Sequence, residues 1–183
     1  MDFVHLVFDR PAMRLRIFGP DAPTDAFEAS GDAWGDGLHA PYGHDYPIPP
    51  GHYQLTTIDH IDPPIASEGA AQIQVEDLDA DALDALIRDA HAMHAPGAVP
   101  AANIGGLHGD LGGLARHGRA AIMVHGGGSN APDPFAPRQQ LCKTFGCTRM
   151  HNEDLATLVA YLEHHPDRRT VFTVLGDPAP LAR

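Results

Sequence analysis

The sequence has few of the residues that several classes of protein require. Its 183 residues include 2 cysteines, a single tryptophan, and 12 lysines and arginines against 24 aspartates and glutamates. Two cysteines are too few for a disulfide scaffold. A formal net charge of −12 argues against a nucleic-acid partner, because phosphate binding requires clustered basic residues. No apolar run approaches the roughly 20 residues that cross a bilayer, so we predict no membrane span and no nucleic acid.

The N-terminus also lacks the pattern of a signal peptide. Residues 1–5 already have the character of a strand, and Asp9-Arg10-Pro11 interrupts any apolar run. We therefore expect that the chain reaches its place of action by another route, or that an export signal has been removed from it.

Hydrophobic patterning predicts one α+β domain over residues 1–183 with a mainly β core. Alternating or β-branched segments predict strands over 4–8, 13–18, 52–58, 119–124 and 170–175. Helical spacing predicts one helix over 76–94 and another that begins after Asn152, its expected N-cap, and ends at His164-His165-Pro166. Residues 19–45 and 96–118 show no period, which predicts irregular segments.

The residues that suggest chemistry lie between 122 and 154. A strand ends at His125, three glycines follow, and Gly146-Cys147 forms a predicted tight turn ahead of the last helix. Acyl transfer by cysteine requires a thiolate, a base that forms it, and N–H donors for the developing oxyanion. Cys147 is predicted to be the nucleophile and His125 the base, while Gly146 allows the backbone to approach a substrate closely.

This arrangement resembles the signature of the L,D-transpeptidase catalytic domain (YkuD type), which is a His, a variable loop, and then Ser/Thr-x-Gly-Cys-x-Arg/Asn. The matching parts are His125-Gly126 and residues 144–149, TFGCTR. Residues 46–53, YPIPPGHY, are similar to the family's Thr-Pro-x-Gly-x-Tyr/Phe segment. The opening hairpin and the helix start at residues 152–155 also resemble the family, so the likeness spans most of the chain.

The resemblance implies a small, β-rich, mixed-sheet, sandwich-like domain with a helical and Gly-rich insertion at about residues 74–118 that caps the cleft. It implies that Cys147 attacks peptidoglycan stem peptides in the periplasm or cell wall, with no metal and no cofactor. The carbonyl of Gly126 would orient His125, and Arg149 at the rim of the cleft would bind a substrate carboxylate. The N–H groups of Phe145, Gly146 and Cys147 would form the oxyanion hole, and Thr144 and Phe145 would contact the substrate.

Two features of the signature differ from the family pattern. Phe145 stands where many members carry a second His, and the loop over residues 126–143 has 18 residues, a little more than usual.

Several alternatives stay open at the level of sequence. Transfer of the acyl group to an amine gives a transpeptidase, whereas transfer to water gives a carboxypeptidase, including one secreted as an antibacterial toxin. Cys142, Cys147, His151 and His125 are a poor but possible zinc frame, the two cysteines could pair as a disulfide, and Cys142 is expected in the core. A non-catalytic wall- or protein-binding domain is the alternative of another class. A lipase-like site is excluded, because the chain has no Gly-x-Ser-x-Gly.

Overall fold

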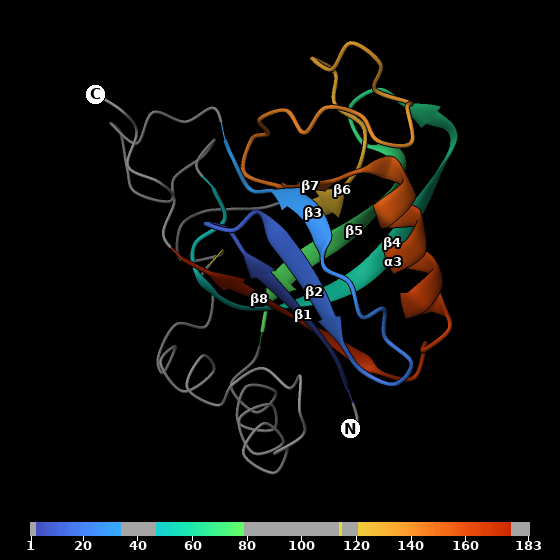
Figure 1. Cartoon of the computed structure of the whole chain (residues 1–183). Coiled ribbons are helices and arrows are strands. Elements are labelled where there is room, and N and C mark those ends of the chain that lie inside the picture. The colour runs from blue at the N-terminus through green and yellow to red at the C-terminus, as the bar shows by residue number, and fades with distance from the viewer. Residues whose placement is uncertain (1–2, 34–46, 79–113, 115–120, 177–183) are drawn as a thin grey trace.

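The computed structural model describes residues 3–33, 47–78, 114 and 121–176, which form a closed β-barrel flanked by one helix (Figure 1). The strands follow one another around the barrel in the order β1-β2-β3-β7-β6-β5-β4-β8. Their bounds are β1 Phe3–Asp9, β2 Arg14–Phe18, β3 Phe27–Ser30, β4 Gly51–Ile65, β5 Gly69–Asp77, β6 Ile122–His125, β7 Thr148–Met150 and β8 Arg169–Leu175. The helix is α3, Asn152–Glu163.

The sheet is mixed, as predicted. β1 and β8 run parallel, as do β6 and β7, whereas the other neighbours in the barrel are antiparallel. Because the sheet closes on itself, the described strands form a barrel, and the sandwich-like arrangement is not confirmed. Closure gives each described strand a neighbour on both sides over at least part of its length.

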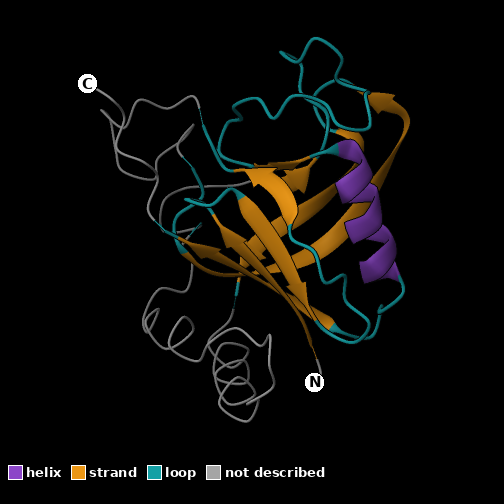
Figure 2. Ribbon diagram, in the orientation of Figure 1, coloured by secondary structure: helices purple, strands orange, loops and turns teal. Residues whose placement is uncertain are grey.

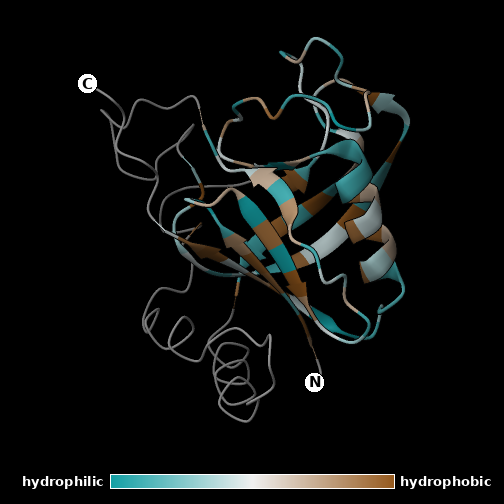
Figure 3. Ribbon diagram, viewed as in Figure 1, coloured by the Kyte–Doolittle hydropathy of each residue, from teal (hydrophilic) through white to brown (hydrophobic). Residues whose placement is uncertain are grey.

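Alternation along the strands explains the core. Val4, Leu6 and Phe8 on β1 are fully buried and share one hydrophobic cluster with alternate residues of the other strands. Figure 3 shows the same alternation as brown and teal bands along the strands. The cluster includes Leu15, Ile17, Tyr53, Leu55, Ile73, Val75, Ile122, Val124, Met150, Phe172 and Val174.

The helix after residue 151 is confirmed, although its cap is not the one predicted. Leu155, Leu158 and Leu162 bury one face of α3 in the common core, and the helix runs alongside the barrel (Figure 2). His151 is the N-cap and makes no capping bond with its side chain, so Asn152 is the first helical residue and the expected Asn152 cap is wrong.

The other predicted elements divide into three groups. The strands at 4–8, 13–18, 52–58 and 170–175 are confirmed, and β6 begins at Ile122 and includes His125. β3, β5 and β7 were not predicted as strands, and β3 lies in the segment 19–45 that was predicted to be irregular. The predicted helix does not begin at residue 76, because β5 continues to Asp77. The rest of that helix, residues 79–94, lies outside the described residues, as does most of the insertion predicted over 74–118.

Two further features of the fold bear on the site. The long connection from β6 to β7 and the β4–β5 turn lie together at one end of the barrel (Figure 1). In the described part of the chain, no helix has the length and apolar character needed to cross a bilayer.

Candidate active site

The pairing of β6 with β7 places the three main predicted residues on one face of the sheet. The strands run parallel with Val124 opposite Thr148 and His125 opposite Arg149. Cys147 precedes β7 and is two residues from Arg149, so it is a diagonal neighbour of His125. Cys147 is followed by β7 and not directly by a helix, which corrects the predicted turn-to-helix geometry.

These side chains line one cavity of about 370 Å³. Its walls come from the start of β6, the loop after β6, the 143–149 segment and the β4–β5 turn. The residues that line it are Ser67, Glu68, Ala121, Ile122, Met123, His125, Ser129, Asn130, Lys143, Thr144, Phe145, Cys147 and Arg149. The cavity therefore brings together Cys147, His125 and Arg149 from segments that are far apart in the sequence, with Thr144 and Phe145 beside them.

His125 is held in one tautomer by its own strand end. Its Nδ1 lies 2.8 Å from the Gly126 carbonyl oxygen, the contact that the family resemblance implies. A carbonyl can only accept, so Nδ1 carries the proton and Nε2 keeps its lone pair. The arrangement gives a neutral ring that can accept a proton at Nε2.

The surroundings of His125 favour that neutral ring. Burial, and then the charge of Arg149, lower the pKa of His125 to about 4, although the carbonyls of Gly126 and Ser67 act in the opposite direction. The side chain is 4% exposed. At neutral pH His125 is therefore uncharged and ready to act as a base.

Arg149 is buried, not at the rim of the cleft as predicted. It is 6% exposed, and its Nη1 donates to the carbonyl oxygens of Cys142 at 3.0 Å and Lys143 at 3.3 Å. Its Nε is buried and has no hydrogen-bond partner among the described residues. Burial lowers the pKa of Arg149, whereas coulombic interactions with Cys142, Cys147 and Glu68 act in the opposite direction. By the same attraction, Arg149 stabilises a thiolate at Cys147.

Thr144 and Gly146 shape the turn that carries Cys147. The Thr144 hydroxyl donates to the Cys147 carbonyl oxygen at 2.8 Å and accepts the Gly146 N–H at 3.0 Å. Gly146 has φ 111°, a conformation that other residues rarely adopt. The Gly146 N–H is thus already bonded, which corrects its prediction as an oxyanion donor. The Thr144 hydroxyl is also engaged within the turn, so its predicted contact with substrate is not available to that group in this structure.

Phe145 and Cys147 complete the turn. Phe145 is 66% exposed at the cavity, so its ring is accessible for the substrate contact that the resemblance implies. Cys147 is 7% exposed, and its Sγ lies 3.8 Å from the Ala121 carbonyl oxygen. The two cysteines are not disulfide-bonded, and Cys142 is half-buried, so its expected place in the core is not confirmed.

Two polar residues outside the predicted site, Gln139 and Asn152, support the glycine loop. Gln139 is buried, and its Nε2 donates to the carbonyl oxygens of Gly127 at 3.0 Å and Met150 at 2.9 Å. Asn152 Oδ1 accepts the Gly127 N–H at 2.8 Å. The loop is close to the β4–β5 turn, and a Cβ on Gly127 would lie 2.5 Å from the Gly69 nitrogen. Of these two residues, only Asn152 lies in a segment that resembles the family, the helix start at residues 152–155.

The alternative zinc frame is not assembled in this structure. His151 points away from the cavity, with Nδ1 donating to the Gln139 carbonyl oxygen at 2.9 Å and Nε2 near Glu28 at 3.3 Å. Among residues 3–33, 47–78, 114 and 121–176, no three His, Cys, Asp or Glu side chains converge as metal ligands.

We expect His125 to make folding sensitive to mild acid. The pKa of His125 is about 4 in the folded protein and 6.5 without perturbation, so the unfolded chain binds more protons between these values. The contribution of His125 to the unfolding free energy should therefore be fully present above pH 6.5 and be lost progressively as the pH falls towards 4. Urea denaturation would measure the unfolding free energy of each protein at pH 7 and at pH 5. From pH 7 to pH 5 this free energy should fall by about 2 kcal/mol more in the wild type than in His125→Gln.

A matched variant controls for the loss of a histidine elsewhere. His60→Gln changes a side chain that is 61% exposed and pairs with Glu163 at 2.7 Å, so it measures the effect of removing a histidine outside the core. Equal losses in wild type and His125→Gln would show that His125 does not titrate as its burial requires.

Comparison with known proteins gives a fold and no family. No protein-family model and no curated protein matches the sequence. Among solved structures, Bd1075 of Bdellovibrio bacteriovorus is similar, with a TM-score of 0.51 and 13% identity over 94% of this chain. The match covers 47% of Bd1075, so this chain spans about half the length of that protein. At this identity the likeness shows a shared fold alone.

Proposed function

We propose that the barrel is an L,D-transpeptidase-type domain that transfers an acyl group from peptidoglycan stem peptides through a Cys147 thioester. The observation that carries the proposal is the hydrogen bond from His125 Nδ1 to the Gly126 carbonyl, made in the cavity that Cys147 also lines. It leaves Nε2 as the proton acceptor in the cavity that the Cys147 side chain also lines.

The proposed reaction has two halves. Nε2 of His125 takes the thiol proton, and Cys147 Sγ bonds to the carbonyl carbon of the third stem residue. The amide C–N bond between that residue and the D-amino acid then breaks. His125 returns the proton to the leaving D-amino acid, which leaves a thioester. An amine or a water then gives a proton to His125 and attacks the thioester carbonyl carbon, the C–S bond breaks, and His125 returns the proton to Sγ. The product is a cross-link or a shortened stem.

Charge in the cavity supports the thiolate more than the imidazolium. Arg149 disfavours a protonated His125 and attracts the negative charge on Cys147. Developing negative charge on the substrate oxygen requires N–H donors. The Gly146 N–H is bonded to Thr144, so the Phe145 N–H is the donor that we propose from this turn. The substrate places the reaction in the periplasm or cell wall.

We expect the purified protein to act on tetrapeptide stems that end in a D-residue and to leave stems that end in an L-residue nearly untouched. Mass spectrometry of treated muropeptides would measure both released D-amino acid and new cross-linked dimers. Release without dimers identifies a carboxypeptidase, and dimers identify a transpeptidase.

The same experiment tests the substrate class separately from the nucleophile. Absence of both products with the wild type, together with a thioester to a different acyl donor trapped on Cys147, would contradict the cell-wall substrate and retain the cysteine chemistry. Absence of any covalent adduct would favour a binding domain without catalysis.

A further inference from the structure

The orientation of His125 depends on one peptide unit, the amide between Gly126 and Gly127. A trans peptide is planar, with its C=O and N–H pointing in opposite directions. In this unit the Gly126 carbonyl oxygen accepts from His125 Nδ1 at 2.8 Å, and the Gly127 N–H donates to Asn152 Oδ1 at 2.8 Å. His125 and Asn152 therefore hold opposite edges of the same plane.

This peptide has little intrinsic resistance to rotation, because both flanking residues are glycines. Gly127 has φ 61°, a region that glycine enters freely, and neither residue has a Cβ to limit the torsions on either side. The direction of the plane must be set by its hydrogen bonds. Gly126 N–H and Gly128 N–H donate to the carbonyl oxygens of Glu68 and Ala66, at 3.0 and 2.6 Å, and these bonds anchor the two ends of the segment. The contact with Asn152 acts on the central plane itself.

The side chain of Asn152 has one orientation that satisfies its neighbours. Nδ2 donates to the carbonyl oxygens of Pro134 at 2.9 Å and Ala136 at 2.8 Å, which leaves Oδ1 facing the Gly127 N–H. Its backbone N–H donates to Gln139 Oε1 at 2.9 Å. Because His151 is the N-cap, the Asn152 side chain is not used for capping α3 and is committed to the glycine loop.

We propose that Asn152 is a positioning residue for His125, because its hold on the Gly127 N–H sets the peptide plane whose carbonyl selects the tautomer of the ring. If the plane rotated by half a turn, it would present the Gly127 N–H to Nδ1 in place of the Gly126 carbonyl. Nδ1 would then become the acceptor and the proton would move to Nε2, which could no longer accept one from Cys147. The functional consequence rests on the proposed function, whereas the tautomer itself does not.

The tautomer can be read directly in the full-length protein. Nitrogen-15 spectra of histidine-labelled protein at pH 7 distinguish a protonated Nδ1 from a protonated Nε2, and the spectrum of His125→Gln identifies the His125 signals among those of the 13 histidines. We expect the Nδ1–H form in the wild type and a mixture or the Nε2–H form in Asn152→Ala. Alkylation of Cys147 at neutral pH, and kcat on the muropeptide, should fall by about 10–100-fold with little change in KM.

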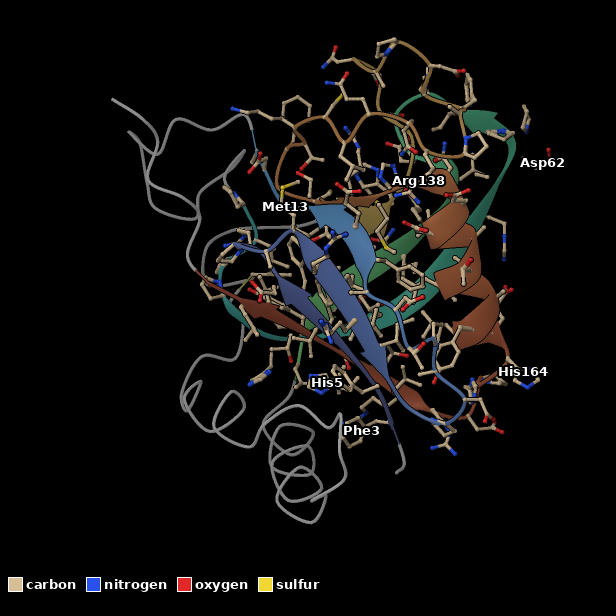
Figure 4. All side chains as sticks on the ribbon, in the orientation of Figure 1. Phe3, His5, Met13, Asp62, Arg138 and His164 are labelled. Atoms are coloured by element: carbon tan, nitrogen blue, oxygen red, sulfur yellow. The ribbon has the colours of Figure 1, made fainter. Side chains whose placement is uncertain are left out.

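Asn152→Asp separates positioning from general structural support. It keeps an oxygen for the Gly127 N–H but loses both donors to the 134–136 segment, so it should retain the Nδ1–H form and most of the thiol reactivity at some cost in stability. Arg138→Ala is the matched control. Arg138 lies at the N-terminal end of α3, and His164 lies at the other end of the helix (Figure 4). Arg138 pairs with Glu153 at 2.7 Å.

The outcomes are distinct. An unchanged His125 tautomer in folded Asn152→Ala overturns the proposal, and so does the Nε2–H form in Asn152→Asp, which remains informative even where the alanine variant does not fold. The expected tautomers together with a wild type that is inactive on muropeptides would support the positioning role and refute the proposed substrate.

Discussion

Replacing Cys147 by alanine should reduce the release of D-amino acid and the formation of dimers by at least about 10³-fold while leaving the fold intact. Loss of a covalent nucleophile removes the reaction path itself, and such losses in other enzymes reach about 10⁶-fold. The side chain is 7% exposed, and the contact of Sγ with the Ala121 carbonyl at 3.8 Å is long. Removal of one sulfur should therefore change stability little, as thermal unfolding would show.

Cys142→Ala is the matched control for Cys147→Ala. Cys142 is half-buried and contributes its backbone carbonyl, not its thiol, to the contact with Arg149, so this variant should keep nearly full activity. Alkylation across a range of pH should modify Cys147 faster than Cys142 in the wild type. Faster modification of Cys142, or activity that survives in Cys147→Ala, would assign the nucleophile elsewhere.

Local patterns were sufficient to predict much of the barrel and the helix. β1, β2 and β8 alternate or are rich in β-branched residues, and α3 repeats Leu155, Leu158 and Leu162 at helical spacing, so each element carries its own signal. β3 has four residues and β5 ends in Glu76 and Asp77, which also suit the first turn of a helix. Short or ambiguous segments of this kind become strands because neighbouring strands pair with them, which a local pattern does not contain.

The candidate site shows the same division. The signature placed Cys147, His125 and Gly126 together, and the contact of His125 with the Gly126 carbonyl needs only adjacent residues. The depth of Arg149 could not be predicted, because it depends on the carbonyls of Cys142 and Lys143 turning toward the guanidinium. Asn152 was predicted from its sequence position as a cap. Its actual partners, Gly127, Pro134 and Ala136, come from a loop whose path is a tertiary property.

Burial changes what is expected of Arg149→Lys, which should lower both stability and activity. Nη1 holds two backbone carbonyls of the segment leading to Cys147, and a lysine ammonium cannot reproduce the planar guanidinium at this depth. A buried acceptor that loses its donor costs about 1–3 kcal/mol of unfolding free energy, measurable by chemical denaturation. We expect kcat/KM to fall by about 10–100-fold, since a lost hydrogen bond to a charged group is worth about 1.5–3 kcal/mol. Arg138→Lys, at a side chain that is 51% exposed, should change neither quantity.

A pair of substrates separates the two roles of Arg149, holding the turn and binding a carboxylate. The wild type and Arg149→Lys would each be assayed on a stem with a free terminal carboxylate and on the same stem with a terminal carboxamide. If Arg149 binds the carboxylate, the wild type should prefer the acid and the variant should lose that preference, so the two changes are not additive. Arg149 is a lining residue of the cavity, from which its guanidinium would make that contact. An equal preference in both proteins would show that Arg149 only supports the Cys147 turn. Another cation of the cavity would then recognise the carboxylate, and Lys143 lines the same cavity.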